Sequence, residues 1–170
     1  MVFLGRLDKI KGVHIAIDVA KKTNRKLLIA GNISDDINEK EYFEKEIKPC
    51  IDDDQIVYLG EVNDIQKNYY LGKAKAMLFP ILWDEPFGIV MIESMACGTP
   101  VAAYPVDGPI EVLTTNSGQM QGGVLHADLS EATQQALLIP RHIARARAYD
   151  FSWQRASQLF LSYVSKIKTV

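Results

Sequence analysis

The stretch VFLGRLDKIKGVHIAIDVAKKTNRKLLIA, residues 2–30, decides the fold class. It opens with a short apolar run at Val2–Leu4 and closes with another at Lys26–Ala30. Between them, the apolar residues at positions 13, 15, 16, 17, 19 and 20 follow helical spacing, and lysines gather near the end of that segment. A strand, a helix and a second strand in this order predict a βαβ unit, in which the two strands lie parallel.

The same alternation continues along the rest of the chain. Further apolar runs predict strands at Ile56–Leu59, Ala76–Phe79, Val101–Tyr104 and Gly123–His126. Helices are expected over residues 38–48, stopped by Pro49, and over residues 64–74, 88–96, 130–138 and from 152 onward. In the helix over 64–74 we expect Ile65, Tyr69 and Leu71 to face the sheet. The order predicts an α/β fold, a doubly wound parallel sheet of Rossmann-like type with helices on both faces.

Ligands of doubly wound sheets bind outside the carboxyl ends of the strands. The loops expected at that edge are Gly5–Gly12, Gly31–Asp36, Gly60–Asp64, Pro80–Gly88 and Pro105–Pro109. We therefore expect the ligand-binding and catalytic residues to lie in these five loops.

Composition narrows the function classes. The 19 Lys and Arg residues nearly balance the 21 Asp and Glu residues, so the chain lacks the basic field of a nucleic-acid-binding protein. Cys50 and Cys97 have no companion at metal-ligand spacing, and we expect two buried thiols and no metal. Residues 1–11 lack the charged and then apolar order of a signal peptide, and no apolar stretch is long enough to span a bilayer. We therefore expect a cytoplasmic protein.

The first loop carries two cations, Arg6 and Lys11, before a helix begins. Arginine can bind phosphate oxygens in a bidentate manner and lysine supplies a mobile point charge, so the pair suits a pyrophosphate group. The alternative is a solvated surface loop.

The segment from Trp83 to Pro100 carries the sharper signal. Pro86 has no N–H, and the backbone N–H groups of Phe87, Gly88 and Ile89 are expected to stand unpaired at a helix start, where anions bind.

Two glutamates belong to this segment. Glu93 lies on an otherwise apolar helix, where a carboxylate needs a partner such as a ribose diol, or else an ion pair with Arg6 or Lys11. Glu85 precedes the helix and is expected either to reach a ligand group beyond the phosphates or to cap the helix.

Motifs of competing functions are absent from the chain. It has no G-x-x-x-x-G-K-[ST] loop, and GNIS at residues 31–34 departs from G-x-G-x-x-G, which disfavours Walker-type NTPases and dinucleotide oxidoreductases. No G-x-S-x-G elbow is present, so His14 and His126 are expected to be structural.

With these residues in place, the chain resembles the C-terminal domain of the GT-B retaining glycosyltransferases, the "glycosyl transferases group 1" family. FLGRL at 3–7 with KG at 11–12 is similar to the family's F-x-G-R-L…K-G opening. EPFG at 85–88 with ESMACGTPV at 93–101 is similar to its E-x-F-G…E-A-M-A-C-G-x-P-V signature, with Ser94 in place of an alanine. The resemblance covers nearly the whole chain.

The resemblance implies a role for each site residue. Arg6 and Lys11 would neutralise the diphosphate of a nucleotide-sugar donor and stabilise the leaving nucleotide, which makes them catalytic together with Glu85. Glu85 would contact the transferred sugar, Glu93 would hold the ribose, and Val62 would lie near the base. The remaining contacts would come from backbone groups at the start of the following helix: Phe87, Gly88 and Ile89. No metal and no other cofactor is expected.

The resemblance also implies what this chain lacks. In the family the acceptor binds mainly to an N-terminal domain, so we expect residues 1–170 to be a single nucleotide-sugar-binding domain, a fragment of a longer protein that transfers little alone. The final helix, from Ser152, is expected to pack on its own domain or on a second copy. The basic segment Arg141–Arg147 is expected to be a solvated helix face, with contact to anionic lipid as the alternative.

Two other interpretations stay open at the level of sequence. A non-hydrolysing sugar-nucleotide epimerase shares the GT-B architecture, although the E-x7-E pair formed by Glu85 and Glu93 argues against it. A non-catalytic interaction module of flavodoxin-like topology would use the same two glutamates only as structural acids.

Overall fold

A computed structural model describes residues 1–167 of the chain and gives a six-stranded sheet in the order β3-β2-β1-β4-β5-β6. All neighbouring strands are parallel. The strands are β1 (Val2–Leu4), β2 (Leu27–Ala30), β3 (Ile56–Gly60), β4 (Met77–Phe79), β5 (Val101–Ala103) and β6 (Gly123–Leu125). This order is the Rossmann order, not the flavodoxin order, so the predicted fold class is confirmed and the flavodoxin-like topology is wrong.

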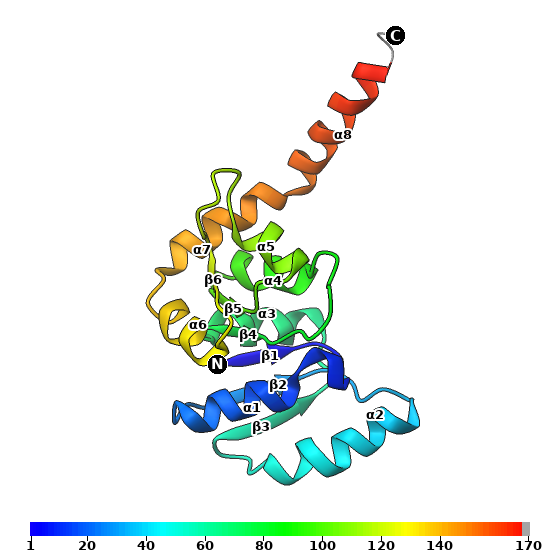
Figure 1. Ribbon diagram of the computed structural model, residues 1–170, viewed down its shortest axis with the longest axis vertical. Coiled ribbons are helices and arrows are strands. Elements are labelled where there is room, and N and C mark those ends of the chain that lie inside the picture. Colours follow the sequence, from blue (N-terminus) through cyan, green and yellow to red (C-terminus); the bar gives the residue numbers. More distant parts are fainter. Residues whose placement is uncertain (168–170) are drawn as a thin grey trace.

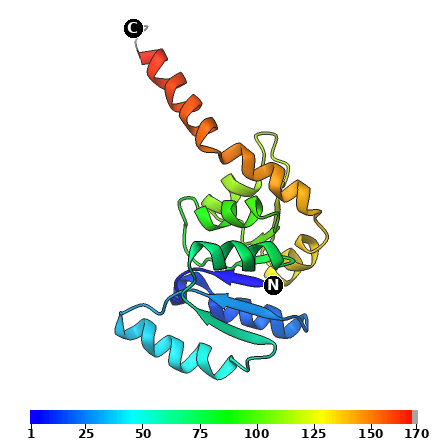
Figure 2. The same cartoon turned by 180° about the vertical axis from the view of Figure 1, so that it is seen from behind.

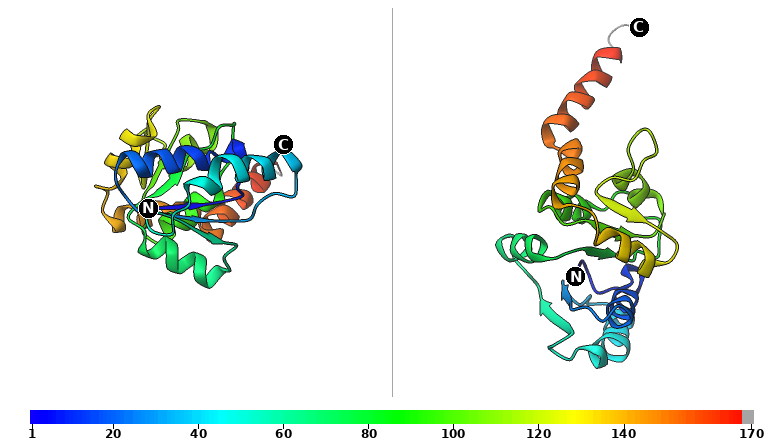
Figure 3. Two further views of the ribbon diagram at one scale, coloured as in Figure 1. Left: turned by 90° about the horizontal axis from the view of Figure 1, so that it is seen from below. Right: turned by 90° about the vertical axis from the view of Figure 1, so that its left-hand side faces the viewer.

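The described part of the chain has eight α-helices, most of which connect or cover the strands (Figure 1). They are α1 (Val13–Lys22), α2 (Ile37–Tyr42), α3 (Asp64–Lys73), α4 (Ile89–Ala96), α5 (Asp107–Leu113), α6 (Leu129–Ala136), α7 (Arg141–Ala148) and α8 (Trp153–Ile167). Short 3-10 turns lie at Lys9–Lys11, Lys48–Cys50 and Tyr149–Phe151, and a π-helical turn lies at Phe43–Ile47. The views from below and from the side show helices on both faces of the sheet (Figure 3).

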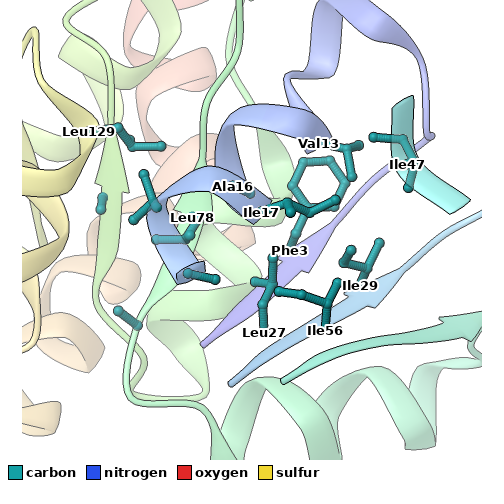
Figure 4. Close-up of a cluster of buried hydrophobic side chains, with 14 of the residues drawn as sticks. Phe3, Val13, Ala16, Ile17, Leu27, Ile29, Ile47, Ile56, Leu78 and Leu129 are labelled. Carbon is teal, nitrogen blue, oxygen red and sulfur yellow. The ribbon is translucent and has the colours of Figure 1, made fainter. Parts of the chain in front are cut away.

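In every strand except the edge strand β3, alternate residues enter two different cores. Phe3, Ile29 and Leu78 join the core beneath α1, the segment after α2, and α6. The intervening residues, such as Val2 and Met77, join the core beneath α3, α4, α5 and α7. The first core is drawn in Figure 4, where Ile17 of α1 lies over side chains of the central strands. Near-continuous apolar strands are therefore required because both faces of the sheet are buried.

Several sequence-based expectations differ from the structure. Pro49 does not end the helical region: α2 passes through the π turn into a 3-10 turn that contains Pro49 in its first positions, where a proline N–H would be unpaired anyway. Ile65 and Tyr69 do not face the sheet, since they are 82% and 60% exposed, and Leu71 alone of the three is buried. The cysteines are half-buried free thiols.

The segment Pro105–Pro109 is not simply a loop, because α5 begins inside it at Asp107. Pro109 lies in the first turn of α5, where the missing N–H costs no helical hydrogen bond. The residues that suggested a loop are therefore those that a helix start accepts.

Helix α8 does not pack on its own domain. It points away from the sheet in Figure 1 and in the view from behind (Figure 2), and Trp153, Leu159, Phe160 and Leu161 on it are more than half exposed. Among residues 1–167, no helix combines the length and apolar character needed to cross a lipid bilayer.

The basic segment forms α7 and is only partly solvated. Arg147 is buried and donates to the backbone oxygens of Glu111, Val112 and Thr114. Arg141 donates to the oxygens of Gly72, Ala74 and Cys97 near the ends of α3 and α4. The expectation of a solvated face is therefore wrong for Arg147, whereas Arg141 stays exposed. Both arginines satisfy carbonyl groups that helix ends and loops leave unpaired.

Candidate functional site

The carboxyl ends of the central strands border a cleft of about 550 Å³. The strand order reverses between β1 and β4, and the loops that follow these two strands form opposite parts of the rim. The loops after β2 and β3 and the first turns of α3 and α4 complete the lining. Four of the five expected loops thus contribute to the cleft, and the segment after β5 does not line it.

Two glycines allow the elements around the cleft to approach closely. Gly12 has a φ of +73°, and a Cβ on it would lie 2.1 Å from the carbonyl oxygen of Pro80. The N–H of Leu82 donates to the oxygen of Ile10 at 2.8 Å, which joins the loop after β1 to the loop after β4. Gly108 of α5 donates to the carbonyl oxygen of Glu85 at 2.8 Å, and its missing Cβ leaves room for that loop. Lys11 and Glu85 are brought together by these contacts.

Lys11 and Glu85 form the central ion pair of the cleft. Lys11 Nζ lies 2.7 Å from Glu85 Oε2, and the two side chains are only 19% and 17% exposed. The indole N–H of Trp83 donates to the same oxygen at 3.2 Å, and Lys11 Nζ lies 5.4 Å from the centre of the Trp83 ring. Glu85 is therefore not the cap of α4, whose N-cap is Gly88 with no side-chain hydrogen bond.

Arg6 stands at the edge of the cleft. Its side chain is 58% exposed, and Nη2 lies 2.9 Å from Oδ2 of Asp8, which is buried. Asp8 Oδ1 has no hydrogen-bond partner among the described residues, so the buried carboxylate depends on Arg6 for its charge compensation. The pair ties the guanidinium group of Arg6 to Asp8, while more than half of the side chain remains in contact with solvent.

Glu93 faces the cleft from α4 and pairs with neither Arg6 nor Lys11. Its Oε1 lies 2.6 Å from Nζ of Lys67, which also lies 3.0 Å from Oδ1 of Asp64. The hydrogen bond that Lys67 donates to Glu93 raises the pKa of Lys67, so this ammonium stays charged near neutral pH. The alternative of an ion pair with Arg6 or Lys11 is therefore wrong, and the contact of Glu93 with a ribose stays a prediction.

The start of α4 supplies free donors, as the sequence predicted. Within residues 1–167, the backbone N–H groups of Phe87, Gly88 and Ile89 donate no hydrogen bond. Gly88 and Ile89 line the cleft, whereas Phe87 does not and packs its ring on that of Phe151, with centroids 5.7 Å apart. Any contribution of Phe87 to the cleft must therefore come from its backbone.

The cleft gathers seven of the eight expected site residues, namely Arg6, Lys11, Val62, Glu85, Gly88, Ile89 and Glu93. Sequence reasoning missed Asn32, Glu61, Asp64 and Lys67, which also line it. The last two lie in the first turns of the helix that follows β3, and the position of that helix at the carboxyl edge of the sheet was the signal that could have found them. Within the described residues, no cluster of His, Cys, Asp and Glu is arranged to hold a metal ion.

Comparison with known proteins assigns the chain to a family. Residues 1–149 match the family "Glycosyl transferases group 1". The chain belongs to this family. A phosphatidyl-myo-inositol mannosyltransferase of Mycobacterium leprae is 30% identical over 181 residues, which cover 96% of this chain and 46% of that protein. Another protein of that name, from Propionibacterium freudenreichii, is 34% identical over 104 residues, covering 56% of this chain and 27% of the other.

Solved glycosyltransferase structures share the architecture. Sucrose-phosphate synthase from Thermosynechococcus elongatus superposes with a TM-score of 0.76 at 26% identity, covering 99% of this chain and 46% of that one. The chain thus spans less than half the length of each of these three proteins. The GT-B likeness inferred from the motifs is confirmed, and membership of a transferase family argues against the non-catalytic interaction module.

Proposed function

We propose that this chain is the donor-binding half of a glycosyltransferase, which holds a nucleoside diphosphate sugar in the cleft for retaining transfer to an acceptor. The observation that carries the proposal is the convergence of Arg6, Lys11, Glu85 and Glu93 on one cleft at the reversal point of the sheet. Ligands of doubly wound sheets bind at this point. The retaining outcome rests on the resemblance to the family.

In the proposed complex, the two cations serve the diphosphate. Arg6 and Lys11 neutralise it and stabilise the charge that develops on the leaving nucleotide as the sugar departs. The free N–H groups of Gly88 and Ile89 at the start of α4 add donors at a favourable end of the helix dipole. Because side chains and backbone donors compensate the charge, we propose that no metal is needed.

The remaining parts of the donor meet polar and apolar groups in turn. Glu93 accepts hydrogen bonds from the ribose hydroxyls, and Val62 lies against the base. Glu85 contacts the transferred sugar once Lys11 turns toward the phosphates. The likeness to phosphatidyl-myo-inositol mannosyltransferases supports a hexose donor, with mannose among the first sugars to test.

The acceptor is proposed to bind a second domain, and this chain alone is expected to bind donor and to transfer little sugar. The length of the relatives supports this division, since the chain spans less than half of each. Both cysteines are free thiols, as in a protein that works in the reducing cytoplasm.

Calorimetric titration of the chain with UDP, GDP and ADP tests the proposal. One of the three is expected to bind, and Lys11→Met is expected to weaken it by about 10- to 100-fold through loss of a charge-assisted phosphate contact. Lys45→Met is the matched control, because Lys45 is an exposed lysine paired with Glu41 away from the cleft. Absence of binding by all three nucleotides contradicts the proposal. Interconversion of a nucleotide sugar without an acceptor supports the epimerase instead.

A further inference from the structure

Lys67 is a cation of the cleft that neither the sequence motifs nor the proposed donor contacts use. Its side chain is 21% exposed and reaches across from α3 to Oε1 of Glu93 at 2.6 Å. The carboxylate of Asp64, which is 91% exposed, lies on its solvent side at 3.0 Å. Lys67 is therefore held between a rim residue and the carboxylate proposed to bind the ribose.

The local structure of α3 explains why this lysine points inward. Asn63 and Gln66 form a capping box that fixes the first turn of the helix, and the N–H of Lys67 donates to the oxygen of Asn63 at 2.7 Å. Leu71, one turn further on, is buried against the sheet. Residues four apart share a helix face, so burial of Leu71 directs Lys67 toward the sheet and its carboxyl edge.

The geometry points to Lys67 as a positioning residue for nucleoside recognition. Its bond to Oε1 fixes the orientation of the Glu93 carboxylate, while Oε2 has no partner among residues 1–167. The free oxygen is thereby placed to accept a hydrogen bond from a ribose hydroxyl. Because Lys67 already orders the Glu93 side chain, the ligand does not have to supply the entropic cost of ordering it on binding. This inference rests on the proposed function and adds to it the residue that makes the cleft distinguish ribose from deoxyribose.

The alternative role for the same ion pair is to join α3 to α4 and nothing more. In that case loss of Lys67 weakens all ligands alike, through displacement of the helices. The two roles differ in the ratio of affinities for a ribonucleotide and its 2′-deoxy counterpart. That ratio cancels any effect on the phosphates and the base, which both ligands share.

The experiment is a titration of wild type and Lys67→Met with whichever of UDP, GDP and ADP binds, and with its 2′-deoxy analogue. For the wild type we expect the ribonucleotide to bind about 10-fold more tightly, the value of one hydrogen bond to a charged group. In Lys67→Met this ratio is expected to fall to about two, with little change in the affinity for the deoxynucleotide. Lys67→Arg, which keeps a donor beside Glu93, is expected to retain part of the ratio.

Two further variants sharpen the result. Lys73→Met removes a lysine from the same helix that lies over the Tyr69 ring outside the cleft, and it is expected to leave the ratio unchanged. Combined with Glu93→Gln, Lys67→Met is expected to have no additional effect on the ratio, because it acts through that carboxylate.

Equal weakening of both nucleotides by Lys67→Met, or a ratio that Lys67→Met leaves at the wild-type value, overturns the role of Lys67 alone. If Lys67→Met lowers the ratio of affinities further in the Glu93→Gln background, Lys67 does not act through Glu93. If wild type binds none of the three ribonucleotides, the proposed function and this inference fail together.

Discussion

Gly108 offers a sharp test of how the cleft is assembled, because it lies outside the cleft and 23 positions from the glutamate whose backbone it contacts. A Cβ on Gly108 would lie 2.4 Å from the carbonyl oxygen of Glu85 and 2.8 Å from the backbone nitrogen of Phe87. Ordinary contacts begin at 3.4 Å, so in Gly108→Ala the turn that carries Glu85 must move by about 1 Å. A displacement of that size at a reacting centre can cost about 100-fold in rate.

The expected result separates two parts of the donor. Gly108→Ala is expected to keep its affinity for the nucleoside diphosphate within about 2-fold, since Arg6 and Glu93 stay in place. The wild type is expected to bind the nucleotide sugar more tightly than the nucleotide alone, because Glu85 contacts the sugar. Gly108→Ala is expected to lose most of this difference in affinity. Overpacking lowers the free energy of unfolding by about 1–3 kcal/mol, which shifts the melting temperature down by several degrees.

Calorimetry with paired ligands and thermal melting measure these effects. Gly72→Ala is the control, because an added Cβ at Gly72 meets no atom within 4 Å and a helical alanine is favoured by roughly 0.5–1 kcal/mol. In a Trp153→Phe background, Trp83 reports on the same turn by fluorescence, since its indole N–H donates to Glu85. If Gly108→Ala melts at the wild-type temperature and still distinguishes nucleotide sugar from nucleotide as the wild type does, the close approach of Gly108 to the Glu85 backbone is not what positions Glu85.

Two further predictions concern stability. Arg141→Ala is expected to lower the free energy of unfolding by roughly 2 kcal/mol in urea titrations, because it leaves the carbonyls of Ala74 and Cys97 without their charged donor. Arg145→Ala removes a single hydrogen bond to the carbonyl oxygen of Ala96 and is expected to lower the free energy of unfolding by less than about half as much. Equal losses of stability in the two variants would contradict the role of Arg141 in capping helix ends. Burial raises the pKa of Tyr42 from 10.0 to about 12, so the folded chain keeps a proton that the unfolded chain releases. Stability relative to Tyr42→Phe should therefore fall by up to roughly 3 kcal/mol from pH 10 to 12, and a pH-independent difference would contradict burial of the phenol.

The strands were predictable to within one residue at each end because each is a short apolar run closed by a change of composition. Val2–Leu4 ends at a glycine, and Met77–Phe79 ends at Pro80. Apart from the edge strand β3, the strands bury side chains on both faces. Their apolar runs are therefore nearly continuous and contain no polar residues that alternate toward solvent.

Two helices were harder to predict for opposite reasons. The start of α5 uses Asp107, Gly108 and Pro109, residues that are typical of turns and equally acceptable in a first helical turn. In α3, Ile65 and Tyr69 have helical spacing and apolar side chains, yet they point to solvent because the cleft and Leu71 determine which face turns inward. Local composition does not contain that tertiary information.

The candidate site was predictable where chemistry and loop position agreed and not where partners had to be matched. Arg6, Lys11 and Glu85 were found because they lie on loops at the carboxyl edge of the sheet. The alternative ion pair of Glu93 with Arg6 or Lys11 is wrong, since its partner Lys67 is 26 positions away and comes from a helix whose orientation was misjudged.

The charges of the cleft bear on which ligand it favours. Its lining includes three cations and four carboxylates: Arg6, Lys11 and Lys67 with Glu61, Asp64, Glu85 and Glu93. Each of the three cations already has a carboxylate partner within 3.0 Å. A free nucleoside diphosphate that draws Lys11 toward its phosphates leaves Glu85, which is 17% exposed, without compensation, and a buried unpaired carboxylate is costly. A nucleotide sugar offers phosphates to Lys11 and hydroxyl donors to Glu85 at the same time. If the cleft binds a nucleotide sugar as proposed, the ion pair is expected to favour the complete donor over its nucleotide part and to favour release of the nucleotide once the sugar has left.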